Sequence, residues 1–319
     1  MGDLWMSRVR FGTYFDYYLD FPKLKLHVLE AEALGYHSAW IMDHLIWKGH
    51  QLPFNEKGSV LESWTTLSAL ASLTQKIRLG TLVLCNSYRN PALLAKMAST
   101  LDNISNGRLE LGMGAGWHKE EYVAYGFPFP EAKDRIMQLR EAITIIKKMW
   151  TEKKPSFQGR YYNIKGANCE PKPLQKPHPP LWIGGAGEKL TLKVVAEHAD
   201  GYNIGASPKD FARKMMILKK HCKRMNKDFN AIQKSWVGEV IIDEDDDTLA
   251  RKIEALKPKQ TPLEEYLKST IVGSPEKCVE KVSQYVREGA TLFILLFRRY
   301  REDRRLFMDK VVPKVGRVS

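Results

Sequence analysis

Short β-rich runs alternate with longer amphipathic runs along almost the whole chain. Eight of the short runs predict strands, at residues 9–15, 38–42, 77–84, 109–113, 180–183, 201–204, 236–242 and 291–297. The longer runs predict helices at residues 22–34, 62–73, 91–104, 131–150, 188–198, 208–225, 275–288 and 302–312. Runs 77–84 and 291–297 are nearly continuous in apolar residues, which is typical of parallel strands buried on both faces. Three predicted helices begin with a capping residue before proline, at Asn90, Ser207 and Ser274.

Eight successive strand-then-helix units favour a closed (β/α)8 TIM barrel of the α/β class. An open, doubly wound sheet is the alternative. Three segments depart from the simple alternation: a long loop at 44–61, a hairpin and proline-rich stretch at 151–179, and an acidic run with an extra helix at 243–272. No linker divides the chain, so we expect one domain over residues 1–319, with insertions after strands two, four and seven.

Composition narrows the class of protein. Apolar residues make up 44% of the 319 residues, which is enough for a large packed core. No apolar run reaches the length of a membrane span, and the first residues lack an apolar signal core, so we expect a cytoplasmic protein without a membrane partner. The four cysteines are scattered and the eight histidines show no His-x-x-x-His spacing. We therefore predict no metal site.

The net charge of +13 has two interpretations. One is a lysine-rich surface, and the other is a polyanionic ligand, either a nucleic acid or a cofactor with phosphate and carboxylate groups. Five arginines between Arg298 and Arg305 follow the last predicted strand, where they either begin a solvated helix or meet anionic groups. The cluster is short and lacks aromatic partners, so we expect no nucleic-acid partner.

In a barrel of this kind, function resides in the loops that follow the strands. Asp43 and His44 follow strand two, where they could bind a ligand, move a proton or simply cap a loop. After strand four, Gly112-Met-Gly-Ala-Gly116 would let a ligand approach the backbone, or would form a tight turn. After strand five, the small residues of 184–187 precede a predicted helix, where exposed N–H groups would suit a phosphate or merely make a turn.

Several of these segments together resemble the bacterial luciferase-like superfamily, and in particular its F420-dependent oxidoreductases. The resemblance lies in residues 40–44, 79–83, 88–96, 107–117, 121–130 and 180–187. Six such segments lie in the right order between residues 40 and 187. The resemblance implies a barrel that holds a flavin-type cofactor at its C-terminal mouth.

The same resemblance assigns expected roles to individual residues. A cis peptide bond between Leu82 and Val83 would back the cofactor ring, with Cys85 beside it where relatives often have threonine or serine. His44 and Glu120 are the expected proton-handling residues. The expected cofactor-binding residues are Asp43, Leu82, Val83, Cys85, Trp117, Gly184, Gly185, Ala186 and Gly187.

The leading functional hypothesis is hydride transfer between coenzyme F420 and a small organic substrate. An FMN-dependent monooxygenase that uses reduced FMN, O2 and a separate reductase is the first alternative. The alternative of another class is a basic nucleic-acid or regulatory binding protein on a barrel scaffold. The resemblance also implies a homodimer. Aromatic residues Trp47, Phe54 and Tyr266 are expected to shape an apolar substrate pocket.

Overall fold

The computed structural model describes residues 9–15, 19–46, 60–298 and 301–315. Its parallel strands are β1 (Arg10–Tyr14), β2 (Ser38–Ile41), β3 (Arg78–Thr81), β4 (Leu84–Cys85), β5 (Leu109–Gly114), β8 (Leu181–Gly184), β9 (Gly201–Ile204), β10 (Gln233–Ile242) and β12 (Leu292–Leu296). The ring closes because β12 pairs with β1 on one side and with β10 on the other. The predicted TIM barrel is therefore confirmed, and the open sheet is wrong. In the described chain β1, β2, β3, β5, β8, β9, β10 and β12 each pair with a neighbour on both sides, and the short β4 pairs with β5.

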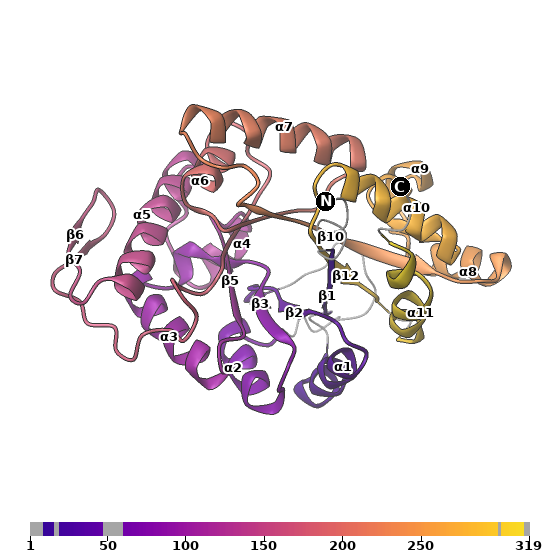
Figure 1. Ribbon diagram of the computed structural model, residues 1–319, viewed down its shortest axis with the longest axis horizontal. Helices are drawn as coiled ribbons and strands as arrows, with labels where there is room; N and C mark the ends of the chain where they lie inside the picture. Colours follow the sequence, from indigo (N-terminus) through magenta and orange to yellow (C-terminus); the bar gives the residue numbers. More distant parts are fainter. Residues whose placement is uncertain (1–8, 16–18, 47–59, 299–300, 316–319) are drawn as a thin grey trace, which may run out of the picture.

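Helices surround the barrel (Figure 1). They are α1 (Phe21–Ala33), α2 (Ser63–Leu73), α3 (Pro91–Ile104), α5 (Ala132–Thr151), α6 (Thr191–His198), α7 (Pro208–Arg224), α10 (Pro275–Arg287) and α11 (Glu302–Lys310). Three of these helices begin at the capping residues that the sequence predicts. The side chains of Asn90, Ser207 and Ser274 accept hydrogen bonds from backbone N–H groups in the first turns of α3, α7 and α10.

The insertions contain additional elements. The fourth unit contains a short helix that the sequence did not predict, α4 (Lys119–Ala124), and the predicted hairpin, β6 (Phe157–Gln158) with β7 (Asn163–Ile164). The seventh unit contains α8 (Asp246–Leu256), α9 (Leu263–Lys268) and β11 (Ile271–Gly273), which extends the sheet beside β10. Two 3-10 turns, Asn86–Tyr88 and Val312–Lys314, complete the elements of the described chain. The acidic run begins α8 as expected, because the Asp245 side chain caps that helix.

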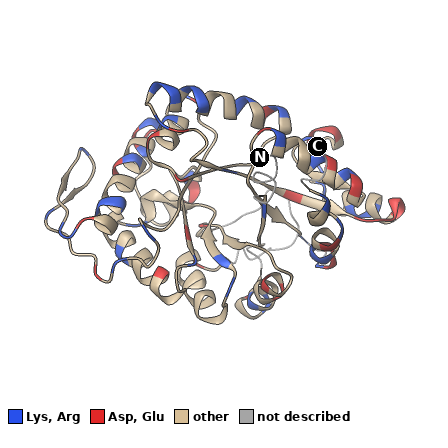
Figure 2. Ribbon diagram, in the orientation of Figure 1, with Lys and Arg blue, Asp and Glu red and all other residues tan. Residues whose placement is uncertain are grey.

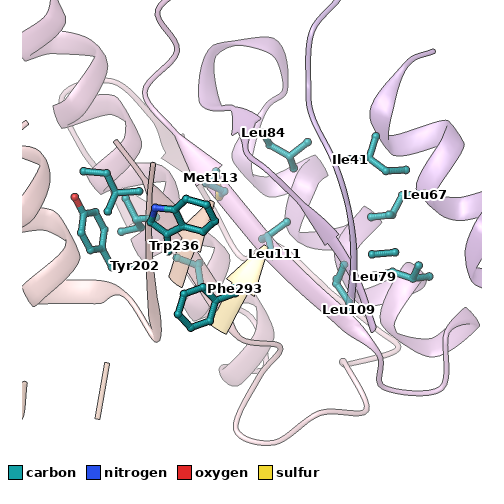
Figure 3. Packing of buried hydrophobic residues seen from close by; sticks show 14 of the residues in the cluster. Ile41, Leu67, Leu79, Leu84, Leu109, Leu111, Met113, Tyr202, Trp236 and Phe293 are labelled. Carbon is teal, nitrogen blue, oxygen red and sulfur yellow. The ribbon is translucent and has the colours of Figure 1, made fainter. Parts of the chain in front are cut away.

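The core lies in two layers. Inside the barrel, Trp40 and Trp182 pack edge to face, with ring centroids 5.7 Å apart. Glycines on neighbouring strands make room for them, since a Cβ on Gly80 would lie 2.3 Å from Trp40 and one on Gly201 would lie 2.2 Å from Trp182. Outside the barrel, leucines of β3 and β5 such as Leu79 meet the apolar faces of the helices (Figure 3).

The described arginines that follow β12 are mostly engaged within the fold. Arg304 is buried and pairs with Glu30 of α1, which Arg301 also contacts. Arg298 pairs with Glu239 of β10. Lys and Arg residues are spread over the outer helices, with many on α7 (Figure 2). None of the described helices is long and apolar enough to cross a membrane.

Candidate active site

A cavity of about 620 Å³ opens at the C-terminal ends of the barrel strands. A cavity of this size is typical of small-molecule and cofactor sites. The sequence-predicted residues that line it are Asp43, His44, Leu82, Val83, Cys85, Trp117, Gly184, Gly185, Ala186 and Gly187. The structure thus brings together side chains and turns that follow the second, third, fourth and fifth barrel strands.

The third barrel strand is interrupted at the cavity. The ladder breaks between β3 and β4, and the intervening peptide bond between Leu82 and Val83 is cis, as the family resemblance implied. The next strand segment is fixed by Asp43, whose carboxylate accepts a hydrogen bond from the backbone N–H of Cys85 at 2.9 Å. Ser63 donates to the same carboxylate at 2.6 Å, and Arg89 donates to both of its oxygens. Asp43 therefore anchors the bulge that forms the cavity wall.

The Val83 side chain occupies space that glycines leave open on β5 and β8. A Cβ on Gly114 would lie 2.8 Å from Val83, and one on Gly184 would lie 3.0 Å from it. A Cβ on Gly112 would come within 2.0 Å of the Thr81 carbonyl oxygen. Gly112 and Gly114 therefore accommodate the bulge of the neighbouring strand. Gly114 and Gly116 also line the cavity, and close approach of a ligand to their backbone stays a prediction.

The imidazole of His44 contacts the carboxylate of Glu121, which lies 77 residues later in the chain. Its Nδ1 lies 3.1 Å from both carboxylate oxygens, and the backbone N–H groups of Leu45 and Ile46 donate to Oε1 at 2.7 and 3.0 Å. Tyr88 donates its hydroxyl to Oε2 at 3.0 Å. Burial acts to raise the pKa of Glu121, but the hydrogen bonds from His44 and the two amides prevail and lower it to about 2. The carboxylate is thus ionised and fixes the orientation of the imidazole.

The prediction of Glu120 as the acidic residue of the site is off by one position. Glu120 is exposed and does not line the cavity, whereas Glu121 is 1% exposed and does. The two residues point in different directions because successive residues of a helix are rotated by about 100°. Trp117, by contrast, lies at the mouth as expected, 64% exposed, with its ring centroid 5.8 Å from that of His44.

Cys85 lies in the cavity wall, but its thiol is engaged within the protein. The Sγ atom lies 3.0 Å from the hydroxyl of Tyr122. Burial raises the pKa of the thiol above its ordinary value. Gly116 lets these groups meet, because its φ of +76° is in the left-handed region and a Cβ there would lie 1.9 Å from the Tyr122 oxygen. Cys85 therefore contributes a neutral, largely buried side chain to the wall.

The turn at 184–187 lines the cavity as predicted, but a helix does not begin directly after it. Residues 188–190 form a turn, and α6 starts at Thr191, which itself lines the cavity. The turn is fixed from outside, because the hydroxyl of Tyr202 donates to the Gly185 carbonyl at 3.0 Å and Lys214 donates to that of Ala186 at 2.5 Å. Gly185 has a φ of +142°, which side chains rarely allow.

Sequence reasoning missed Arg135, which brings positive charge to the cavity. It lies on α5, is 9% exposed, and donates to the Gly116 carbonyl at 3.2 Å while its guanidinium lies over the Phe129 ring at 4.1 Å. In the amphipathic sequence pattern of a helix, an arginine that faces a cavity looks the same as an arginine that faces solvent. Only the packing of α5 against the turn after β5 shows that this one faces inward.

Of the three aromatic residues expected to shape the substrate pocket, Tyr266 lies within the described residues. Trp47 and Phe54 lie outside the described residues. Tyr266 is buried and donates its hydroxyl to Glu239 at 2.6 Å. It is not among the lining residues of the described cavity, so the prediction that it shapes the pocket is wrong. The tyrosine instead packs between α9 and the sheet because its hydroxyl finds a carboxylate on β10.

Known proteins resemble this chain in sequence and in fold. The chain is 26% identical to an F420-dependent glucose-6-phosphate dehydrogenase of Amycolatopsis mediterranei, over 91% of this chain and 93% of that protein. It is 33% identical to the Microbacterium testaceum protein of the same name, over 58% of this chain and 54% of that one. The solved structure of an F420-dependent secondary alcohol dehydrogenase with an F420-acetone adduct superposes with a TM-score of 0.84 at 18% identity, over 97% of this chain and 99% of the other.

The similarity in fold to the alcohol dehydrogenase covers 97% of this chain. The similarity in sequence to the Amycolatopsis mediterranei protein covers 91% of it. A family model described as luciferase-like monooxygenase matches residues 4–265, a range that includes the bulge, the His44 loop and the small-residue turn. The chain belongs to the luciferase-like monooxygenase family.

Proposed function

We propose that this protein is an F420-dependent oxidoreductase that transfers a hydride between the deazaflavin and a small organic molecule. The observation that carries the proposal is the cavity at the barrel mouth, where the Leu82–Val83 wall, the 184–187 turn and His44 meet. The names of the full-length relatives support the same cofactor. The cofactor supplies the redox chemistry when bound, so the protein has to supply binding, orientation and proton management.

The residues present fit such a cofactor, which combines a planar ring with a phosphate and a glutamate tail. Leu82 and Val83 offer an apolar wall for the ring. The turn from Gly184 to Gly187 has no bulky side chain and offers backbone N–H groups for a phosphate. Arg135 adds a cation that can pair with an anionic group. Asp43 positions this wall from behind, because its carboxylate is engaged by Cys85, Ser63 and Arg89.

His44 is our candidate for the group that accepts or donates the substrate's proton. Glu121 is ionised and can only accept hydrogen bonds, so a neutral His44 carries its proton on Nδ1. Nε2, on the far side of the ring from Glu121, is then the basic nitrogen. Hydride removal from a C–H bond next to a hydroxyl leaves the hydroxyl proton to be taken up, and Nε2 is suited to that task.

The test of this role is His44→Ala. We expect kcat to fall by about 10²–10⁴-fold, as is usual for loss of a positioned acid or base. The dissociation constant for F420, measured by absorbance titration, should change by less than about threefold. His178→Ala, which alters a histidine packed on Trp150 away from the cavity, is the control. Unchanged turnover in the His44 variant would show that His44 is not the acid or base of the reaction.

An FMN-dependent monooxygenase is the second candidate, which the family description itself favours. It would require reduced FMN, O2 and a separate reductase. Titration of the purified protein with F420 and with FMN separates the two candidates. Tight F420 binding with no FMN binding supports the leading proposal, and the reverse result replaces it with the second one.

We further propose that the protein is a single-domain homodimer in the cytoplasm. The absence of an apolar helix long enough to span a membrane among the described helices is consistent with that location. Apolar side chains exposed on the outer helices, including Leu93 and Ile104 of α3, support self-association. Light scattering after size-exclusion chromatography measures the assembly, and a monomeric mass at micromolar concentration would contradict the dimer.

A further inference from the structure

Three side chains that commonly ligate metals meet in the cavity wall. They are His44 in the loop after β2, and His118 and Glu121 around the start of α4. One ligand atom from each lies within 4.8 Å of the other two. The Nδ1 atoms of His44 and His118 lie 3.1 and 3.3 Å from the same oxygen, Oε2 of Glu121.

These separations suit a common metal ion. Zinc binds imidazole nitrogen and carboxylate oxygen at about 2.0–2.2 Å, so two ligand atoms on one tetrahedral ion lie about 3.3–3.5 Å apart. The two nitrogen–oxygen separations are already close to that range. One ring nitrogen of His44 also lies within 4.8 Å of a ring nitrogen of His118, so a modest side-chain rotation brings the two imidazoles to the same ion.

Hydrogen bonds also fix the orientation of the Glu121 carboxylate, as is usual for a metal ligand. Its Oε1 accepts from the amides of Leu45 and Ile46, and its Oε2 from the hydroxyl of Tyr88. Such outer hydrogen bonds orient a ligating group and reduce the entropy lost when a cation binds. The cluster borders the 620 Å³ cavity, so a water or a substrate atom has room to complete the coordination.

We propose that His44, His118 and Glu121 bind a divalent transition-metal cation, with Zn²⁺ as the chemically best-matched ion. The cation would take the place of the proton on Nδ1 of His44, and the neutral imidazole would then carry its proton on Nε2, where it can no longer accept one. It would also hold the imidazole by the Nδ1 atom. The consequence for activity rests on the proposed function: a metal that fixes His44 in this way inhibits proton transfer in the same cavity.

Direct metal binding tests the proposal independently of turnover. Protein stripped with a chelator is titrated with Co²⁺, whose visible absorbance reports tetrahedral coordination, and the Co²⁺ is then displaced with Zn²⁺. We expect one Co²⁺ per chain, released by Zn²⁺. Loss of an outer hydrogen bond typically weakens metal binding about 10–100-fold, so loss of a direct ligand in His118→Asn should weaken it by about 100-fold or more.

The matched control is His221→Asn, which changes a histidine on α7 whose Nε2 contacts the Glu188 carbonyl, outside the cavity. It should bind Co²⁺ like the wild type. Wild-type protein that binds no Co²⁺ at millimolar concentration overturns the proposal whatever the variants do. So does a folded His118→Asn variant, verified by thermal melting, with wild-type affinity.

F420 titration of the same preparations keeps the two proposals apart. Metal binding without F420 binding would leave the metal site standing and defeat the proposed function. F420 turnover without metal binding would do the opposite. If both hold, Zn²⁺ should inhibit the wild type at concentrations that match its measured dissociation constant.

Discussion

At the scale of single residues, the site depends on a carboxylate that is one position away from the one that the sequence suggested. Glu121 is buried and contacts His44, whereas its neighbour Glu120 faces solvent. A hydrogen bond from a histidine to a carboxylate selects the tautomer and the ring orientation, so Glu121 acts on the chemistry through His44. It is a positioning residue for the proposed proton transfer.

Glu121→Gln should therefore lower kcat by about 10–100-fold while leaving KM nearly unchanged, because substrate binding does not require the tautomer. Glu120→Gln, which changes the same chemical group on the exposed face of α4, should stay within about twofold of the wild type. Steady-state kinetics of the two variants measure both parameters. Equal losses in the two variants would contradict the assignment of Glu121.

At the scale of elements, the cavity is built where the third barrel strand breaks. Asp43 holds the second segment, β4, through the Cys85 amide, and it pairs with Arg89 through two hydrogen bonds. Val83 then projects into the space left by glycines of the adjacent strands. The wall therefore depends on a buried ion pair behind it and on the absence of side chains beside it.

Asp43→Ala should cost about 3–5 kcal/mol of unfolding free energy, because it leaves the buried Arg89 charge and the Cys85 N–H without their partner. It should also weaken F420 binding, since β4 would lose its anchor. Asp247→Ala, on the exposed face of α8, is the control and should change stability by less than about 0.5 kcal/mol. Urea unfolding measures both variants, and a loss as small as the control's would refute the anchoring role.

Gly114→Ala places a methyl group 2.8 Å from Val83 and should destabilise the protein by about 1–3 kcal/mol through overpacking. If the clash with Val83 is the cause, the added substitution Val83→Ala should relieve it. The double variant should then lie close to Val83→Ala alone, which gives a coupling free energy in a double-mutant cycle. Strict additivity of the two single variants would show that the glycine has another role.

At the scale of the whole molecule, the last strand and helix of the described chain contact the first strand and helix. β12 pairs with β1, and α11 packs on α1, where the Arg304 guanidinium lies between Glu30 and His27. Burial, followed by the charges of Arg304 and Arg301, lowers the pKa of His27 from 6.5 to about 4. Folding therefore favours the neutral ring at this contact.

The sign of the resulting pH dependence follows from that shift. His27 contributes its full stability above pH 6.5 and loses it as the pH falls towards 4, because the unfolded chain then binds a proton that the folded chain does not. A difference of one pKa unit equals about 1.4 kcal/mol, and partial exposure of the ring reduces the net effect to about 1–2 kcal/mol. His27→Gln should remove this component, so the stability difference between variant and wild type should change between pH 7 and pH 4. A constant difference would contradict the shift.

The sequence by itself determined the barrel and much of its mouth. Strand and helix periodicity record which faces of each element are buried, and the family motifs placed the cis bond at Leu82–Val83 and the small-residue turn at 184–187. Only the tertiary structure decided which loops meet. His44 and Glu121 are far apart in the chain, and nothing in their local patterns records their contact. The same limit applies to Arg135 and to the glycines of β5, because an inward-facing cation and a space left for a neighbouring strand become visible only when the elements pack together.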